Sequence, residues 1–317
     1  MPLPVKIKIV IPAFNDWEAL LQLLGKLHHI AQSNVYTCSI TVVNDCSTRP
    51  VTDELKLWKL LPLQIVHLSR NIGHQRAIAI GITHARFENN ADYILVMDAD
   101  GEDKPEDIPA MIKGATDNPG NIVFAKRTKR NEGFLFRFFY SIYKMVFRML
   151  TGITIEFGNF SIIPASSLKQ IVHVSEIWNH FSGAVIKSKM RYTSIPLERG
   201  KRLAGVSKMN FPSLIIHGMS AVSVHIETVA VRLLLFSVAM IALAGLGILT
   251  VSGIRLFTQF AIPGWASFLV LAFSIIIIQA FLISLFLVFV VLTYRTQKHF
   301  IPANDYKDFI ESIEVIS

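Results

Sequence analysis

The sequence predicts an α/β domain with a mostly parallel sheet, followed by two membrane-spanning helices. Three observations lead to this class. Short apolar segments alternate with segments of helical spacing over residues 5–125. Two long stretches without Asp, Glu, Lys or Arg follow, over residues 233–254 and 256–294. The 317-residue chain is also 52% apolar and only 17% charged, which is a rich apolar content for a soluble protein.

The first 125 residues contain five expected strands and four expected helices. The strands are short apolar runs, at residues 5–11, 39–44, 63–68, 92–97 and 121–126. The helices have apolar residues at helical spacing, at residues 16–32, 51–61, 73–87 and 105–115, and Asp16 can cap the first of them. Such alternation predicts a mostly parallel sheet covered by helices on both faces.

Polar side chains follow the expected strands. In α/β sheets of this kind, ligands bind beyond the carboxyl ends of the strands. The residues that fall there are Pro12 to Asn15, Asn44 and Asp45, Arg70 and Asn71, Asp98 to Asp100, and Lys126 and Arg127. We therefore expect a binding site at this edge of the sheet.

An amphipathic helix is expected at residues 134–150. Its polar side chains Arg137, Ser141, Lys144 and Arg148 are spaced four, three and four residues apart, and the rest of the segment is apolar and aromatic. A basic amphipathic helix close to membrane spans is typical of a segment lying in the membrane surface. An ordinary helix packed on the core is the alternative. Residues 211–228 show a weaker pattern of the same kind.

The two charge-free stretches predict transmembrane helices at about residues 230–253 and 265–293, separated at Pro263-Gly264. Each is longer than the roughly 20 residues that span a bilayer. A pair of buried core helices is the alternative, and stretches this long without charge disfavour it. The expected organisation is a catalytic domain at 1–210, a juxtamembrane helix at 211–229, the spans at 230–293 and a tail at 294–317.

Basic residues flank the spans, while the loop between the spans carries only Arg255. This distribution predicts that both ends of the chain lie in the cytosol. The sequence starts without the pattern of a signal peptide, which agrees with a cytosolic catalytic domain. Cys38 and Cys46 are the only cysteines, and we expect free thiols.

The segment "YILVMDADGEDKPED" at residues 93–107 places acidic residues directly after a strand. Residues two apart in an extended segment point the same way, so Asp98 and Asp100 are expected to face one pocket. Two neighbouring carboxylates repel each other unless a cation lies between them. Mg²⁺ or Mn²⁺ prefers such oxygen ligands together with substrate phosphate. A solvated acidic loop before the helix that starts near Pro105 is the alternative.

Several motifs, in order, resemble those of family 2 glycosyltransferases. They are "IVIPAFND", "VVNDCS", "LSRNIGHQRAIAIGI", "MDADGEDKPEDI", "AKRTKRNEGF" and "IPLERGKRLAGVSKMNF". The two C-terminal spans are similar to those of the subgroup of polyprenyl-phosphate glycosyltransferases and dolichyl-phosphate mannose synthases. The resemblance implies the GT-A fold and an inverting enzyme that uses a nucleotide-sugar. It also implies a homo-oligomer.

The resemblance assigns roles to residues of the sheet edge. Asp98 and Asp100 would hold the metal on the donor diphosphate, and Glu102 would add to its ligands. Donor binding would involve Pro12, Ala13, Asp16, Asp45, Arg70 and Asn71. The basic group Arg199, Arg202, Ser207 and Lys208 would clamp phosphate and stabilise the departing nucleoside diphosphate, with Arg127 as a further candidate. Attraction of this group to anionic lipid is the alternative role.

The chain departs from the family pattern at four positions. Asn44 and Cys46 replace Asp and Gly in the nucleotide motif, and Asn159 and Ser161 replace Asp and Arg in "GNFSII". A hydroxyl acceptor normally needs a base, which an amide at position 159 cannot supply. A phosphate monoester is already an anion at pH 7, so the substitution favours a lipid phosphate acceptor. For a hydroxyl acceptor, Asp103 and Glu156 are the nearby carboxylates.

The sequence therefore predicts an enzyme that moves a sugar from a UDP- or GDP-linked donor to a polyprenyl phosphate, with Mg²⁺ or Mn²⁺. The same chemistry on a glycolipid or saccharide hydroxyl, and a non-catalytic nucleotide-sugar-binding scaffold, are the alternatives. No nucleic-acid motif accompanies the net charge of +8, so a nucleic-acid partner is excluded. A structural role is favoured for His74, and the sequence assigns no function to residues 301–317.

Overall fold

The computed structural model describes residues 4–32, 36–127, 134–154, 157–205, 211–258, 264–297 and 299–317. The chain forms two compact units. The first, here called the sheet unit, contains Met1–Arg137, Ile155–Val224 and His299–Ser317. The second, here called the helical unit, contains Phe138–Thr154 and His225–Lys298.

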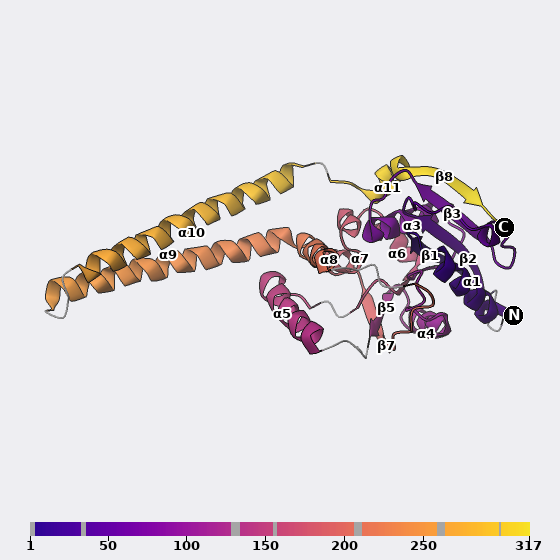
Figure 1. Ribbon diagram of the computed structural model, residues 1–317, viewed down its shortest axis with the longest axis horizontal. Coiled ribbons are helices and arrows are strands. Elements are labelled where there is room, and N and C mark those ends of the chain that lie inside the picture. Colours follow the sequence, from indigo (N-terminus) through magenta and orange to yellow (C-terminus); the bar gives the residue numbers. More distant parts are fainter. Residues whose placement is uncertain are drawn as a thin grey trace. The chain divides into compact units, whose positions relative to one another are not determined.

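An eight-stranded sheet forms the centre of the sheet unit (Figure 1). Its strands lie in the order β7-β5-β6-β4-β1-β2-β3-β8. Their bounds are β1 Val5–Ala13, β2 Tyr36–Asn44, β3 Leu63–Leu68, β4 Tyr93–Val96, β5 Ile122–Arg127, β6 Ser161–Pro164, β7 Tyr192–Leu197 and β8 Ile310–Val315. The five strands expected from the sequence are all present.

The sheet is mixed and mostly parallel, as the sequence predicted. β1 pairs in parallel with β2 and β4, β2 with β3, and β5 with β7. β6 lies antiparallel between β4 and β5, and β8 lies antiparallel along β3. The carboxyl ends of the six parallel strands therefore meet at one edge, where β6 and β8 begin.

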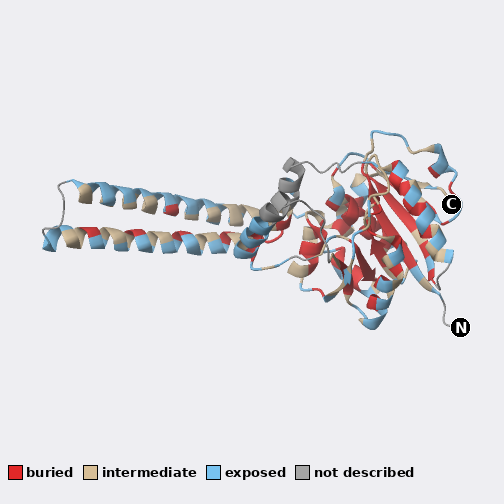
Figure 2. Ribbon diagram, turned by 60° about the horizontal axis from the view of Figure 1, so that its bottom comes forward, coloured by how far each residue is buried: buried red, intermediate tan, exposed pale blue. Residues whose placement is uncertain are grey.

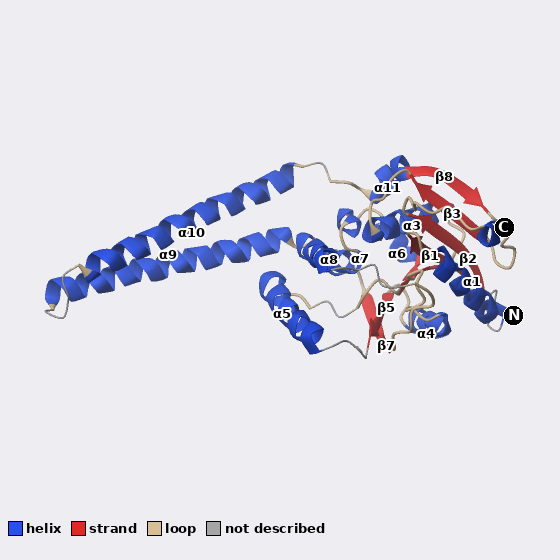
Figure 3. Ribbon diagram, viewed as in Figure 1, coloured by secondary structure: helices blue, strands red, loops and turns tan. Residues whose placement is uncertain are grey.

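Helices cover both faces of the sheet (Figure 3). Three expected helices are observed as α1 Trp17–Gln32, α3 His74–Glu88 and α4 Ile108–Asp117, the last preceded by the 3₁₀ turn η1 Pro105–Asp107. The helix expected at residues 51–61 is only the single turn α2 Asp53–Lys56, and residues 57–61 are not helical. The remaining helical segments of this unit are α6 Ala165–Ile171, η2 Ser175–Trp178, α7 Phe181–Lys187, α8 Phe211–Ser223, α11 Pro302–Asp305 and η3 Tyr306–Phe309.

Two apolar layers hold these helices on the sheet, and Figure 2 shows the buried strands between them. Alternating residues of β1 point to opposite faces: Ile9 and Ile11 join one layer, and Val10 joins the other. Lys8 is also buried, at 3% exposure, and forms an ion pair with Glu88 of α3. Because the central strands are covered on both sides, they read as continuous apolar runs in the sequence.

The helical unit contains two long apolar helices, α9 Ile226–Phe257 and α10 Trp265–Thr296. Both are long and apolar enough to cross a membrane, with mean hydropathy of 2.5 and 3.1 over their most apolar windows. The two helices pack closely, since a Cβ at Gly247 of α9 would lie 2.6 Å from Phe273 of α10. The two helices match the two spans expected from the sequence, and they support the prediction that the chain is a membrane protein.

The amphipathic helix expected at residues 134–150 is observed as α5 Phe134–Thr151. Within the helical unit, Phe147 is buried and meets the ring of His225 edge-on, whereas Met145 and Met149 are 65% and 67% exposed. Its placement in the membrane surface stays a prediction.

The C-terminal residues belong to the sheet unit. After α10 the chain forms α11 and η3 and then adds β8 to the edge of the sheet. The sequence separated residues 294–317 as a tail, and the domain boundaries stay predictions. The structure adds that the last strand of this tail completes the sheet.

Candidate active site

An acidic loop, residues 98–103, follows β4 at the carboxyl edge of the sheet. Four of its side chains are carboxylates, and each lies beside a cationic side chain from another part of the chain. These pairs are Asp98 with His74, Asp100 with Arg202, Glu102 with Arg199 and Asp103 with Arg127. The loop therefore concentrates negative charge where loops from other strands can balance it.

Asp98 lies against the first residue of α3. Its Oδ1 is 3.2 Å from Nε2 of His74. Burial raises the pKa of Asp98, but the charge and hydrogen bonding of His74, with smaller effects of Arg127 and Arg199, bring it below its ordinary value. Desolvation lowers the pKa of His74, and Asp98 and its acidic neighbours outweigh this and raise it. Asp98 is therefore ionised at neutral pH.

Asp100 is held between its own loop and Arg202. Its Oδ2 accepts a 2.7 Å hydrogen bond from Arg202, and its Oδ1 accepts one from the backbone N–H of Glu102. Burial and the nearby charge of Asp98 raise the pKa of Asp100, and Arg202 counteracts them. The charges of Asp98 and Asp100 thus repel each other, and the expectation that both face one pocket stays a prediction.

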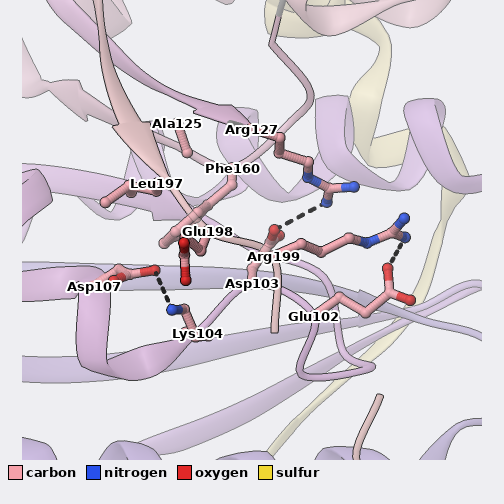
Figure 4. Close-up of a pocket in the computed structure, with 10 residues that line it drawn as sticks. All are labelled: Glu102, Asp103, Lys104, Asp107, Ala125, Arg127, Phe160, Leu197, Glu198 and Arg199. Carbon is pink, nitrogen blue, oxygen red and sulfur yellow. Dashed lines mark hydrogen bonds and ion pairs between the residues drawn. The ribbon is translucent and has the colours of Figure 1, made fainter. Parts of the chain in front are cut away.

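Asp103 lies beneath the loop with a side-chain exposure of 3% (Figure 4). Its Oδ2 accepts the backbone N–H of Asp98, and its Oδ1 lies 3.2 Å from Nη2 of Arg127. Burial, followed by repulsion from Asp98, raises the pKa of Asp103 to about 7. Because both oxygens already hold donors, Asp103 positions the acidic loop.

A basic loop, residues 199–203, packs directly on the acidic loop. The N–H of Gly200 donates to the carbonyl of Glu102, and that of Leu203 donates to the carbonyl of Asp100, at 2.8 and 2.9 Å. Glycine is needed where the loops touch, because a Cβ at Gly101 would lie 2.3 Å from Leu203 Cγ, and one at Gly200 would lie 2.8 Å from the Gly101 carbonyl. This close packing places Arg199 and Arg202 beside the carboxylates.

Asp45, in the expected nucleotide motif, is buried at 3% exposure. Its Oδ1 accepts the N–H of Ile72 at 2.7 Å, and its Oδ2 accepts that of Gly73 at 2.9 Å. Asn71 donates to its backbone carbonyl. Burial raises the pKa of Asp45 despite these two hydrogen bonds. Asp45 therefore ties the end of β2 to the loop that starts α3.

The residues after Asp45 form a loop, residues 45–49, that is fastened to the end of β1. Asn15 donates its backbone N–H to Ser47 Oγ at 2.9 Å, and its Oδ1 accepts the N–H of Arg49 at 2.9 Å. The indole of Trp17 donates to the Arg49 carbonyl. Pro12 and Ala13 lie at the end of β1 next to this loop, where the N–H of Asp45 donates to the Ala13 carbonyl.

Asn159 lies just before β6, in a chain of side-chain amides. The backbone N–H of Phe181 donates to Gln75 Oε1, so the Gln75 amide nitrogen faces Asn159 Oδ1 at 3.1 Å. This turns the Asn159 nitrogen toward Nε2 of His74 at 3.2 Å, the same ring nitrogen that lies 3.2 Å from Asp98 Oδ1. Nε2 accepts from Asn159 when it carries no proton and donates to Asp98 when it carries one, so the two contacts belong to different protonation states of His74. Asn159 thus supports His74 beside Asp98.

The structure brings most of the expected site residues to the sheet edge. The acidic loop, Arg127, Arg199, Arg202 and Asn159 are in mutual contact directly or through His74. Arg70 instead lies with its guanidinium 5.8 Å from the ring centre of Phe309. Asp16 directly precedes α1, and its carbonyl accepts the N–H of Leu20. Ser207, Lys208 and Glu156 lie outside the described residues.

The described side chains fit a metal that is completed by substrate oxygens. No three His, Cys, Asp or Glu side chains converge on a metal position among the described residues. Within the same residues, Asp98 Oδ1 is buried and has no hydrogen-bond donor when Nε2 of His74 carries no proton and accepts from Asn159. A divalent cation on Asp98 and Asp100 would relieve their repulsion and take further oxygens from a diphosphate.

Sequence reasoning missed Gln75, and it favoured a structural role for His74, which the structure places beside Asp98. Both lie in the first turn of α3, directly after the carboxyl end of β3 and its loop. That position is the signal that could have identified them, since helix starts at this edge face the ligand.

Comparison with known proteins gives the family of the chain. The model of the family described as Glycosyl transferase family 2 matches residues 8–172, just over half of the chain. An uncharacterized glycosyltransferase, YkcC of Bacillus subtilis (strain 168), is 29% identical over 252 residues, which cover 77% of this chain and 75% of the relative. Undecaprenyl-phosphate 4-deoxy-4-formamido-L-arabinose transferase of Pseudomonas fluorescens is 26% identical over 254 residues, covering 78% and 72%.

Among solved structures, glucosyl-3-phosphoglycerate synthase from Mycobacterium tuberculosis, in complex with Mn²⁺ and UDP-glucose, is similar with a TM-score of 0.52. The identity is 11%, and the match covers 71% of this chain and 79% of that chain. This likeness concerns the fold, and it agrees with the GT-A architecture of the sheet unit. The chain is therefore a glycosyltransferase that belongs to glycosyl transferase family 2.

Proposed function

We propose that this enzyme transfers a sugar from a nucleotide-diphospho-sugar to a polyprenyl phosphate, with inversion at the anomeric carbon. One observation carries the proposal: the carboxylates of the acidic loop face cations from three other segments at the carboxyl edge of the sheet. A site with both kinds of charge suits a donor diphosphate that carries a divalent cation, because the carboxylates can bind the cation and the basic side chains can bind the diphosphate.

The donor side is supported by the geometry of the acidic loop. Asp98 and Asp100 would hold Mg²⁺ or Mn²⁺ together with the donor diphosphate, and Glu102 lies next to them. The fold neighbour named above was crystallised with Mn²⁺ and UDP-glucose, which agrees with this assignment. When bound, the cation would neutralise charge that builds up on the diphosphate.

The chain's own residues would act on the leaving group. Arg202 lies at the Asp100 carboxylate, and Arg199 lies at Glu102. Guanidinium groups at this position can turn to the diphosphate oxygens and stabilise the nucleoside diphosphate as it leaves. The anomeric C–O bond to the diphosphate breaks, and the electron pair stays with the nucleoside diphosphate.

The acceptor side is supported by the contacts of Asn159 and Asp103. Asn159 is an amide held by Gln75 and His74, and Asp103 is buried with both oxygens bonded. Neither suits removal of a proton from a hydroxyl acceptor. An oxygen of a lipid phosphate is already anionic and can attack the anomeric carbon opposite the diphosphate. The Pseudomonas fluorescens relative is named for undecaprenyl phosphate, in line with such an acceptor.

The membrane anchor would bring the lipid phosphate and the sheet unit together. The charge distribution around α9 and α10 favours a cytosolic sheet unit. Nucleotide-sugars would then reach the site from the cytosol.

A transfer assay on the full chain tests the proposal. The protein, in vesicles that contain polyprenyl phosphate, is given labelled UDP- and GDP-sugars with Mn²⁺ or with EDTA. We expect label in the organic phase only when both metal and lipid phosphate are present. Vesicles with the corresponding polyprenol are the matched control. Transfer to the polyprenol, or transfer unaffected by EDTA, would contradict the proposal and point to the hydroxyl-acceptor alternative or to metal-independent chemistry.

A further inference from the structure

Three polar side chains form a row across the last strands of the sheet. Asn44 ends β2 and lies directly opposite His67 of β3. On β8, Ser312 lies opposite His67, and Glu314 lies opposite Ile65. Residues two apart on a strand share a face, so Glu314 points to the same side as His67. The row thus connects the C-terminal strand with the end of β2.

The hydrogen bonds in this row all run in one direction. Ser47 donates its backbone N–H to Asn44 Oδ1 at 3.0 Å, which turns the Asn44 amide nitrogen toward His67 Nδ1, also at 3.0 Å. An amide nitrogen only donates, so Nδ1 of His67 accepts and the ring proton is on Nε2. Nε2 lies 3.3 Å from Glu314 Oε2, which accepts that proton.

The loop at the end of this row has an uncommon backbone conformation. Cys46 and Asn15, which flank the bonds between the ends of β1 and β2, have φ of +52° and +56°. Side-chain-bearing residues adopt this region at a cost, so contacts from outside the loop are needed to hold it. Asn44 supplies such a contact from β2, through Ser47.

The same C-terminal segment also holds the end of β3. The N–H of Ser69 donates to the Phe309 carbonyl at 3.0 Å, and the Arg70 guanidinium lies over the Phe309 ring. The segment from Phe309 to Glu314 therefore contacts β3 at His67 and the start of the loop after β3 at Ser69 and Arg70.

We propose that Glu314 and His67 are positioning residues for donor binding, and that the C-terminal strand is a working part of the donor site. The inference rests on the proposed function, with loop 45–49 taken to bind the donor because it begins at Asp45 of the expected nucleotide motif. It also gives a physical reason for Asn44, which stands where the nucleotide motif of the family that the sequence resembles has Asp. A carboxylate there would accept from His67 and require a proton on Nδ1, whereas an amide suits the neutral ring bonded to Glu314.

Two substitutions at position 314 and one control test this relay in the full chain. Glu314→Ala removes the acceptor for His67, while Glu314→Gln keeps an acceptor oxygen. Glu311→Ala removes an exposed carboxylate of the same strand and serves as the matched control. Glu314 is 43% exposed, so each variant is expected to fold, and thermal melting checks this.

The first measurement is amide hydrogen exchange of the peptide that contains residues 45–49, which needs no activity. We expect faster exchange in Glu314→Ala than in Glu314→Gln, Glu311→Ala and the wild type. Equal exchange in all four proteins would overturn the relay.

The second measurement is steady-state transfer. We expect Glu314→Ala to raise KM for the nucleotide-sugar about three- to tenfold, the effect of losing one hydrogen bond, with kcat and KM for the lipid phosphate unchanged. Glu314→Gln should restore the wild-type KM. An unchanged donor KM, or an equal fall of kcat in both variants, would overturn the positioning role. If the wild type transfers no sugar, the proposed function fails, and hydrogen exchange alone still decides whether the relay exists.

Discussion

At the scale of single residues, the site depends on charges that balance one another across loops. Asp98, Asp100 and Asp103 lie within six residues of one another, and each is partly or fully buried. Isolated charges at such positions would be costly, and the cations beside them offset that cost. The balance also leaves Arg202 poised to exchange one anion, Asp100, for another, a substrate phosphate.

Removal of the Arg202 charge should therefore slow the chemical step. We expect Arg202→Ala to lower kcat about a hundredfold or more, because it removes a donor that stabilises the departing diphosphate. Arg202→Lys should retain part of the activity, since an ammonium keeps the charge but not the planar geometry. Initial-rate measurements check this, with Lys201→Ala, an exposed neighbour in the same loop, as the control. A kcat for Arg202→Ala within threefold of the control would disprove the assigned role.

The raised pKa of Asp103 should change how the stability of the folded chain depends on pH. Its pKa in the folded chain is about 7, above the ordinary value of 3.8, so the folded state keeps a proton that the unfolded state has lost between these values. This residue therefore makes stability fall as pH rises from about 4 to 7. In Asp103→Asn the decline should be shallower. Melting temperatures of both proteins, measured with EDTA across this range, test it, and parallel curves would count against the buried acid.

At the scale of elements, the sequence predicted what is local and missed what depends on pairing. The first five strands and α1 to α4 follow from apolar periodicity, because each is covered on a defined face. β6 has four residues and is inserted antiparallel between β4 and β5, an order that no local pattern encodes. β8 is separated from β3 by most of the chain, including α9 and α10, so its partner could not be inferred from neighbouring sequence.

The candidate site shows the same division. The acidic loop and the basic residues were predicted from composition and motif, because their charges are visible in the sequence. The pairing of each cation with its carboxylate was not predicted. Arg199 and Arg202 lie about a hundred residues from the acidic loop in sequence, and backbone hydrogen bonds between the two loops bring them to it. Asn44 looked like a weakened motif, and its hydrogen bond to His67 became visible only with the sheet order.

The helix α5 gives a prediction at this scale. Met149 is 67% exposed on an amphipathic helix of the helical unit, whereas Leu57 is 73% exposed in the sheet unit. We expect a spin label at position 149 in vesicles to collide more with oxygen, which concentrates in lipid, and one at position 57 more with a water-soluble relaxation agent. The labels are placed on a chain with Cys38→Ser and Cys46→Ser. Equal accessibility to the aqueous agent would show that α5 does not lie in the membrane surface.

At the scale of the whole molecule, the sheet constrains the membrane topology. The segments Ile155–Val224, before α9, and His299–Ser317, after α10, belong to one sheet unit, in which β8 pairs with β3. One sheet cannot lie on two sides of a bilayer. If α9 and α10 span the membrane, they must therefore cross it as a hairpin, with both flanks on the same side.

Cysteine labelling tests this topology. In a chain with Cys38→Ser and Cys46→Ser, Thr258→Cys lies beyond the end of α9, and Glu311→Cys lies on β8. We expect an impermeant maleimide to label position 258 in intact cells and position 311 only after lysis, in keeping with the positive-inside distribution. Label at position 311 in intact cells would reverse the proposed orientation. Label at both positions from outside would contradict a membrane hairpin.

The account depends most on the acidic loop as the place where the donor diphosphate is held. The most direct measurement compares metal-dependent sugar transfer to polyprenyl phosphate by the wild type, by Asp100→Asn and by Asp117→Asn, an exposed carboxylate at the end of α4. We predict that Asp100→Asn lowers kcat about a hundredfold or more while keeping its circular dichroism spectrum, and that Asp117→Asn matches the wild type. Transfer by Asp100→Asn within threefold of the wild type, with the same metal dependence, would contradict the account.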